Sequence, residues 1–241
     1  MVAIEQKADC LVCGCALVYD KRQVRRACFY CRMEKPGNAR CKAGHFVCDR
    51  CHSLGGNDLI EKVCAMTEEE DPVKLAIRLM RSPAIKMHGP EHHFLVPAVL
   101  LATYCNAAGE KGEKGNRIRE ARKRAENVPG GFCGFYGDCG AAVGTGIFVS
   151  VATGATPLSR KEWRLANLMT AGSLLAIALH GGPRCCKRNT FLAIGEAVAF
   201  ARRELGVKLP AGRRPACTFS RLNRECLGQE CPFHRHTGKG R

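Results

Sequence analysis

The sequence predicts a mostly α-helical domain preceded by a small zinc-binding module, either a zinc ribbon or a cross-brace. Three observations support this. Residues 1–54 are dense in cysteine and show little helical periodicity, whereas residues 55–207 alternate helix-like apolar segments with glycine or proline. From residue 208 the chain returns to an irregular composition that contains cysteine. We therefore expect a zinc-binding head over residues 1–54, and over residues 55–241 a helical domain with a cysteine-bearing tail.

The 17 cysteines in 241 residues require either disulfides or metal ligation. Residues 1–9 have no basic region, apolar run or cleavage site of a secretory signal. The cysteines also occur in close Cys-x-x-Cys pairs, which suit one metal ion better than long-range disulfides. We therefore expect a cytoplasmic metal-binding protein. No stretch reaches the ~18 uninterrupted apolar residues of a membrane span, so we expect no membrane association.

The formal net charge of +16 favours an anionic partner such as RNA. That value counts every cysteine as neutral, and two zinc ions bound by seven thiolates would contribute about −3. The basic residues are also dispersed along the chain, without a dense run. The charge therefore permits RNA binding without requiring it.

In the middle region, helix-like periodicity and start signals predict seven helices. Pro72 after Asp71 marks one start, and Ser159 with Glu162 three residues later resembles a capping box. Residues 147–152 have the β-branched content of a strand, but their apolar flanks favour a helix. The expected helices are 58–66, 71–81, 90–108, 116–127, 140–151, 160–179 and 184–205.

The head contains eight residues of the types that bind zinc, in paired spacing. A polar segment of this length cannot bury enough apolar surface to fold alone, so two zinc ions would supply the missing free energy. We prefer a sequential grouping, in which the first four ligands match a zinc ribbon, over the cross-brace order of RING-type modules. Cys15 and His52 are spare, and the fully ligated zinc would be structural. The eight expected metal ligands are Cys10, Cys13, Cys28, Cys31, Cys41, His45, Cys48 and Cys51.

Histidines and a glutamate cluster at the start of an apolar helix near residue 90. The positive field of a helix start keeps imidazole neutral and able to ligate a metal or act as a base. An exposed polar helix start is the simpler alternative. We take His88, Glu91 and His92 as catalytic candidates.

Cysteines lie beside glycine in two later segments. Cys133 and Cys139 belong to a glycine-rich loop, and Cys139 falls at a helix start, where a thiolate is stabilised. The adjacent Cys185 and Cys186 also precede a helix, and neighbouring basic residues should lower the pKa of their thiols. We add Cys139 and Cys185 to the catalytic candidates.

The tail supplies Cys217, Cys226 and Cys231, followed by His234. These four could bind zinc, and the three cysteines with one from the domain could hold a [4Fe–4S] cluster. Free or redox-active thiols are a third alternative. We favour the cluster because the thiols outnumber the needs of a further zinc site. The expected cofactor-binding residues are Cys133, Cys139, Cys185, Cys186, Cys217, Cys226 and Cys231.

These motifs together resemble an uncharacterised family, domain-of-unknown-function family 5714. The resemblance rests on residues 10–14, 38–41, 44–52, 88–93, 130–140 and 181–188. It implies that a partner enzyme would be of radical-SAM or methyltransferase type, because such domains look like companions of these proteins. It implies no particular reaction.

We therefore expect a metal-dependent enzyme or enzyme component, with two structural zinc ions and a [4Fe–4S] cluster. Sulfur transfer, thiol redox or methyl-group handling would suit thiolates held near a metal and a neutral base. The alternative is a non-catalytic, zinc-stabilised adaptor that binds RNA or a partner enzyme.

Overall fold

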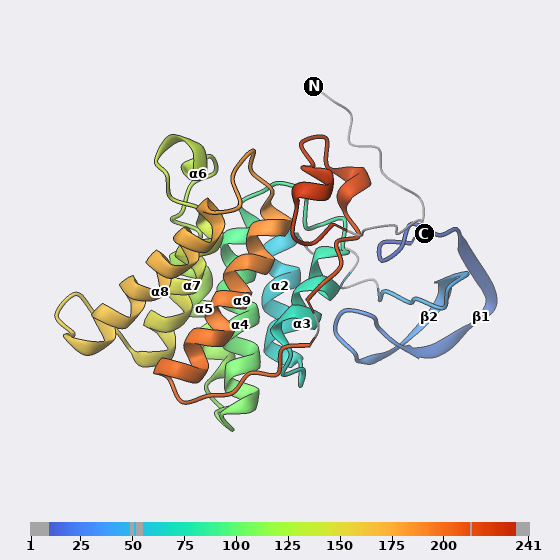
Figure 1. Cartoon of the computed structure of the whole chain (residues 1–241). Coiled ribbons are helices and arrows are strands. Elements are labelled where there is room, and N and C mark those ends of the chain that lie inside the picture. Colours follow the sequence, from blue (N-terminus) through green and yellow to red (C-terminus); the bar gives the residue numbers. More distant parts are fainter. Residues whose placement is uncertain (1–9, 49–50, 52–54, 213, 235–241) are drawn as a thin grey trace.

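The computed structural model describes residues 10–48, 51, 55–212 and 214–234, and shows a helical body with a β-hairpin at one side (Figure 1). The elements are β1 (Leu17–Ala27), β2 (Glu34–Cys41), α2 (Gly56–Met66), α3 (Pro72–Met80), α4 (Glu91–Ala107), α5 (Lys114–Ala125), α6 (Phe132–Phe135), α7 (Gly140–Thr153), α8 (Lys161–Ala178), α9 (Cys186–Glu204) and the short 3₁₀ turns η1 (Ser220–Leu222) and η2 (Gly228–Glu230).

Helix α4 forms the centre of the body. It is apolar on all sides, so other helices must enclose it, and it packs against α2, α5, α7 and α9. Glycines in α7 allow the close contact, because a Cβ at Gly144 would lie 2.8 Å from the ring of Pro97 on α4. Helix α8 covers the other side of α7 and also contacts α9. These contacts bring the starts of α4, α7 and α9 to one end of the body (Figure 1).

The seven expected helices are all present, which confirms the mostly helical prediction, and residues 147–152 lie within α7. Asp71 caps α3 as expected, since its Oδ1 accepts hydrogen bonds from the backbone N–H groups of Val73 (2.9 Å) and Lys74 (3.1 Å). The capping box at Ser159 is wrong, because its hydroxyl accepts from the Thr156 N–H instead.

The head is built around the antiparallel hairpin of β1 and β2, which the sequence analysis did not predict. Leu17 pairs with Cys41 at one end and Ala27 with Glu34 at the other. The strands are rich in charged residues and lack clear apolar alternation, so their pattern carries no strand signal. Buried Tyr30 donates its hydroxyl hydrogen to the carbonyl of Leu11 in the head (3.2 Å) and also interacts with Ser82 of the body.

The tail leaves the end of α9 and returns along the body to the start of the same helix (Figure 1). The N–H of Gly212 donates to Oδ2 of Asp71 at the start of α3 (3.1 Å). Further on, the rings of Phe233 and Phe191 on α9 meet edge to face at 5.2 Å. No helix in the described part of the chain has the length and apolarity to cross a membrane.

Candidate metal and thiol sites

The eight expected ligands of the head form two groups of four, and within each group all ligand atoms lie within 4.8 Å of one another. The groups are Cys10, Cys13, Cys41 and His45, and Cys28, Cys31, Cys48 and Cys51. The first pair thus joins the third and the second joins the fourth, so the preferred sequential grouping is wrong. The hairpin decides this order, because its register carries the start of β1 to the end of β2. Cys15 is in neither group, and His52 lies outside the described residues.

The distances within these groups fit a tetrahedral metal ion. Bonds of about 2.3 Å to zinc place two sulfurs ~3.8 Å apart. The observed Sγ–Sγ distances are 3.8 Å for Cys13 and Cys41, and 4.0 Å for Cys31 and Cys48. Nδ1 of His45 is 3.3 Å from the sulfur of Cys13. Both groups can therefore hold a metal ion such as zinc.

The two Cys-x-x-Cys turns share one backbone conformation. Gly14 donates its N–H to the carbonyl of Cys10 (2.8 Å), and Arg32 donates to that of Cys28 (2.9 Å). Both residues have positive φ, 71° for Gly14 and 61° for Arg32. A hydrogen bond from Cys51 lowers the pKa of Cys28, which favours the thiolate form that binds metal.

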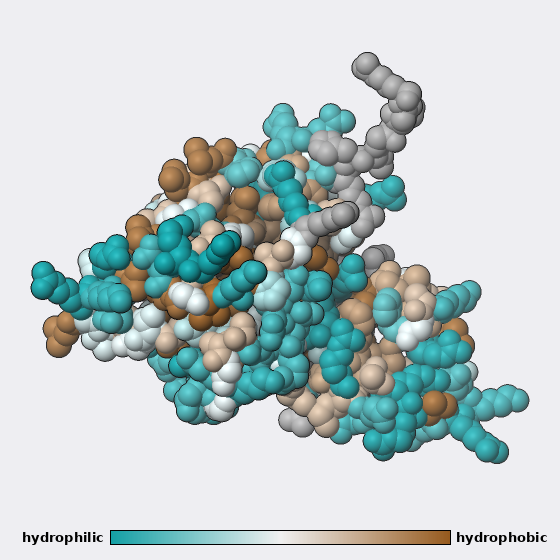
Figure 2. Space-filling model, turned by 60° about the horizontal axis from the view of Figure 1, so that its bottom comes forward, coloured by the Kyte–Doolittle hydropathy of each residue, from teal (hydrophilic) through white to brown (hydrophobic). Residues whose placement is uncertain are grey.

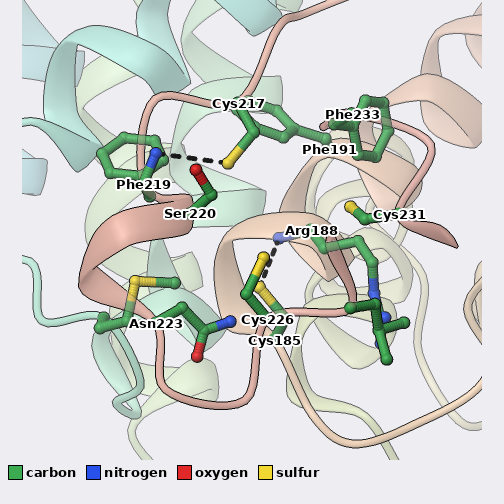
Figure 3. Close-up of a pocket in the computed structure, with 12 residues that line it drawn as sticks. Cys185, Arg188, Phe191, Cys217, Phe219, Ser220, Asn223, Cys226, Cys231 and Phe233 are labelled. Atoms are coloured by element: carbon green, nitrogen blue, oxygen red, sulfur yellow. Dashed lines mark hydrogen bonds between the residues drawn. The ribbon is translucent and has the colours of Figure 1, made fainter. Parts of the chain in front are cut away.

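Four further cysteines line a cavity between the tail and α9, with their sulfurs turned toward a common space (Figure 3). Three are the tail cysteines and the fourth is Cys185, the N-cap residue of α9. The described cysteines of this quartet do not meet the 4.8 Å spacing of the head groups. His234 is not among the residues that line the cavity. We call Cys185, Cys217, Cys226 and Cys231 the cavity quartet.

Backbone N–H groups already point at three of the four sulfurs. In the tail, Phe219 donates to Cys217 (3.3 Å) and Gly228 donates to Cys226 (3.4 Å). In both cases the donor follows the cysteine by two residues, as Val12 follows Cys10 in the head. Arg188 likewise donates its N–H to Cys185 (3.4 Å). Such bonds stabilise a thiolate or a metal-bound sulfur.

Two buried cations follow directly after the cysteine pair of α9. Nζ of Lys187 donates to the carbonyls of Met80 (3.2 Å) and Ile85 (2.9 Å). The guanidinium of Arg188 donates to the carbonyl of Gly181 (2.7 Å). Within the described chain, neither cation forms an ion pair with a carboxylate. Burial lowers the pKa of Lys187 to about 8. Buried cations need nearby negative charge, which the Glu91 carboxylate supplies in part for Lys187 and which ionised thiols would add to.

Cys186 belongs to a different group of thiols from its neighbour Cys185. Its sulfur accepts the N–H of Gly89, just before α4, and it interacts electrostatically with Cys139 and Cys133. The seven expected cofactor ligands therefore form two neighbouring groups, and Cys185 and Cys186 belong to different ones. We call Cys133, Cys139 and Cys186 the loop group.

The thiols of α9 do not have the lowered pKa that their basic neighbours predicted. Burial raises the pKa of Cys185, and it raises that of Cys186 to about 11. Arg188 lowers the pKa of Cys185, but desolvation of the thiolate outweighs it.

The catalytic candidates near residue 90 have structural partners. Nε2 of His88 lies 3.0 Å from Oδ1 of Asn223 in the tail, and Glu91 accepts the N–H of Lys86 (2.7 Å). His92 is 1% exposed, and its ring nitrogens contact the hydroxyl of Thr190 (3.1 Å) and the carbonyl of Lys86 (3.2 Å). Burial lowers its pKa to about 3. With both nitrogens engaged, His92 is placed to hold α4 against α9.

His93, which the sequence analysis passed over, has a freer ring. Its Nδ1 lies 2.9 Å from the carbonyl of Val128, and the ring rests against Gly140 at the start of α7. One position along a helix turns a side chain by about 100°, so His93 faces α7 while His92 faces α9. The histidine-rich pattern of the sequence indicated this region, but only the packing of the helices distinguishes His92 from His93.

The fold and these groups define a cysteine-rich, mostly helical protein with two groups able to hold metal ions. All 17 cysteines lie in the described part of the chain, and no disulfide joins any two of them there. Residues 60–234 match a family of unknown function, DUF5714, and the chain belongs to this family. The match does not include the head, so the head motifs of the resemblance lie outside it. No curated protein and no solved structure shows a significant match to the chain.

Proposed function

We propose that this protein is an enzyme or enzyme component that carries two structural zinc ions and one [4Fe–4S] cluster. The zinc ions occupy the two groups of the head, and the cluster is held by the cavity quartet. Its work is thiol redox, sulfur transfer or methyl-group handling. The observation that carries the proposal is the convergence of four cysteines on one cavity beside two buried cations.

The spacing of the quartet supports a cluster over a single ion. The centre of a zinc tetrahedron is only about 2.3 Å from each sulfur and leaves no room for a water-sized sphere. The cavity has a free volume of about 20 Å³, enough for one such sphere. The four sulfurs therefore stand farther apart than around a single zinc ion, as the ligands of a cluster with several metal atoms must.

The surroundings also suit a cluster. Phe191, Phe219 and Phe233 line the cavity and limit access of water, and solvent exposure is one of the factors that set a cluster's potential. Lys187 lies over the ring of Phe219 at 5.0 Å, and Arg188 lines the cavity. A cluster with four thiolates is an anion, so these cations would compensate its charge.

Four protein ligands leave no iron position for a substrate, so the chemistry suited to this cluster is electron storage and transfer. The thiols of the loop group lie nearest to this cluster, since Cys186 directly follows Cys185. A radical-SAM or methyltransferase protein is the proposed partner enzyme. The exposed rings of Phe135 and Tyr136 on α6 offer it a contact surface next to these thiols.

The test is the absorption spectrum and metal content of full-length protein purified without oxygen. We expect a brown protein with iron, sulfide and zinc, and an absorption band that bleaches on reduction. Cys217→Ser and Cys226→Ser should remove the band and keep the zinc. Cys15→Ser, which removes a thiol outside every group, is the control. A wild-type protein that stays colourless after reconstitution with iron and sulfide overturns the proposal.

A second candidate function is a zinc-stabilised adaptor that binds RNA. Lys21, Arg22 and Arg25 on β1 are exposed beside exposed Tyr19, and this end of the molecule is largely hydrophilic (Figure 2). Basic side chains next to an aromatic ring suit single-stranded nucleic acid. Affinity for single-stranded RNA should fall steeply with salt and vanish when all three cations become glutamate. Absence of binding at low salt would exclude it.

A further inference from the structure

We propose that two copies of this chain pair through the outer face of α8, with the two helices antiparallel about a two-fold axis. This interaction surface goes beyond the proposed cluster, and it depends on no metal ion. The second copy is the occupant that the spacing, the symmetry and the charges of the helix fit.

The first observation is an exposed apolar face on α8. Among the described elements this helix packs chiefly against α7 and α9, and it lies at the outer edge of the helical body (Figure 1). Leu168 and Leu175 on the helix and Leu179 at its C-cap are 42%, 61% and 77% exposed. Ala171 and Ala178 are exposed beside them. A continuous apolar stripe of this kind marks an interaction site.

The spacing of the stripe is that of a helix-pairing seam. Leu168, Ala171, Leu175 and Ala178 follow one another at intervals of three, four and three residues. These are the intervals between the a and d positions of a coiled coil, which face a partner helix. The stripe therefore fits another helix rather than a strand or a flat surface.

The symmetry of the stripe identifies that helix as a second α8. In a two-fold contact, a residue i that meets residue j of the second copy is itself met in the same way. Leu168 and Leu175 are equally far from the point between Ala171 and Gly172. An antiparallel pair centred there sets Leu168 against Leu175 of the second copy, twice. The small residues at the centre let the two helices approach closely.

The charges of α8 favour the same arrangement. Arg160, Lys161 and Arg164 lie at its start with one carboxylate, Glu162, whereas its last turn has no basic residue. The helix dipole favours the opposite distribution. Arg164 lies 3.8 Å from the carboxylate of Glu204, yet its side chain stays 59% exposed. In the antiparallel pair, the cationic start of each helix lies beside the negative end of the other.

The length of the helix sets the strength of the contact. Eighteen residues at 1.5 Å each give a seam of about 27 Å. One helix face of this length is small beside the ~800 Å² per partner of a standard stable interface. We therefore expect a reversible dimer with a dissociation constant in the micromolar range.

The experiment is sedimentation of the full-length protein over a concentration series from about 1 to 100 µM. Wild type should pass from monomer to dimer. Leu168→Glu and Leu175→Lys each set an unpaired charge against a leucine, so each should raise the dissociation constant about 30-fold or more. Val24→Glu, which adds a charge at an exposed apolar position on β1, is the matched control and should dimerise like wild type.

The double variant Leu168→Glu/Leu175→Lys tests the register. The antiparallel pair sets a carboxylate against an ammonium group twice, so dimerisation should return and should weaken with salt. A parallel pair would set like charges together, and the double variant would stay monomeric. Within one helix the two positions are seven residues, about 10 Å, apart, so they cannot form this ion pair in a single chain.

Three results would overturn the proposal. They are a wild type that stays monomeric throughout the series, single variants that dimerise as wild type does, and a double variant that is not restored. The substituted side chains are exposed, and circular dichroism checks that the helices remain. If the charged leucine variants do not fold, Ala171→Arg decides, because it sets two cations together at the axis. An unchanged dissociation constant in that variant rejects the pairing.

Discussion

At the scale of single residues, the two Cys-x-x-Cys turns of the head show how backbone conformation limits metal binding. Gly14 and Arg32 occupy equivalent places after Cys13 and Cys31, and both have positive φ. Glycine adopts this conformation freely, whereas a residue with a Cβ is destabilised by about 1–2 kcal/mol. The turn at Gly14 therefore has the residue that its backbone conformation favours, whereas the turn at Arg32 does not.

We predict opposite effects for substitutions at these two positions. Gly14→Ala should weaken zinc binding by the first group, by about tenfold for each 1.4 kcal/mol of strain. Arg32→Gly should strengthen the second group, but by less, because glycine also gains freedom in the unfolded chain. Competition with a chromophoric chelator measures both. Equal affinities in wild type and both variants would contradict the shared geometry.

At the scale of elements, we expect the hairpin to depend on metal more than the helices do. An isolated two-stranded hairpin is marginally stable in water, and β1 is mostly exposed. Both metal groups are anchored at its ends, since Cys41 closes β2 and Cys28 directly follows β1. Ions held by these groups would therefore replace the apolar core that this segment lacks.

We predict that a zinc chelator unfolds the head and leaves the body intact. Hydrogen–deuterium exchange of the full chain should show loss of protection over residues 17–41, while the buried helix α4 keeps its protection. Cys10→Ser should lose one of the two head ions, and Cys15→Ser neither. A hairpin that stays protected without metal would show that its contacts with the body are sufficient.

At the scale of the whole molecule, the cavity quartet joins the end of the chain to its interior. Three of its cysteines are in the tail, and the fourth begins α9. Besides these thiols, the described tail is held by a few contacts, such as those of Phe233 and the bond of Gly212 to Asp71. A cofactor in the cavity would thus act as a further clamp on the tail, beside the contacts of His88 with Asn223 and of Lys187 with Phe219.

We predict that removal of this clamp releases the tail without unfolding the body. In Cys226→Ser, trypsin should cut after exposed Arg221 and Arg224 faster, by about tenfold for each 1.4 kcal/mol of lost attachment. The unfolding temperature of the helices should change little. Ser220→Ala, in the same cavity but without a thiol, is the matched control. Equal cleavage rates in both variants would refute the clamp.

Much of this protein could be predicted from its sequence. The helices follow from apolar periodicity and from start signals such as Asp71 with Pro72, which are local properties of the chain. The ligand set of the head follows from residue type and spacing. Cys139 was also placed correctly at a helix start, because the glycine-rich loop and the apolar run meet at that point.

Only the tertiary structure decided which ligands meet. The cross-brace order depends on a hairpin whose charged strands carry no periodic signal. The separation of Cys185 from Cys186, and of His92 from His93, depends on which neighbouring element each side chain faces. Adjacent residues on a helix point about 100° apart, so neighbours in sequence reach different partners once the helices pack. Spacing along the chain therefore determined the kinds of ligand present, and packing determined the sites they form.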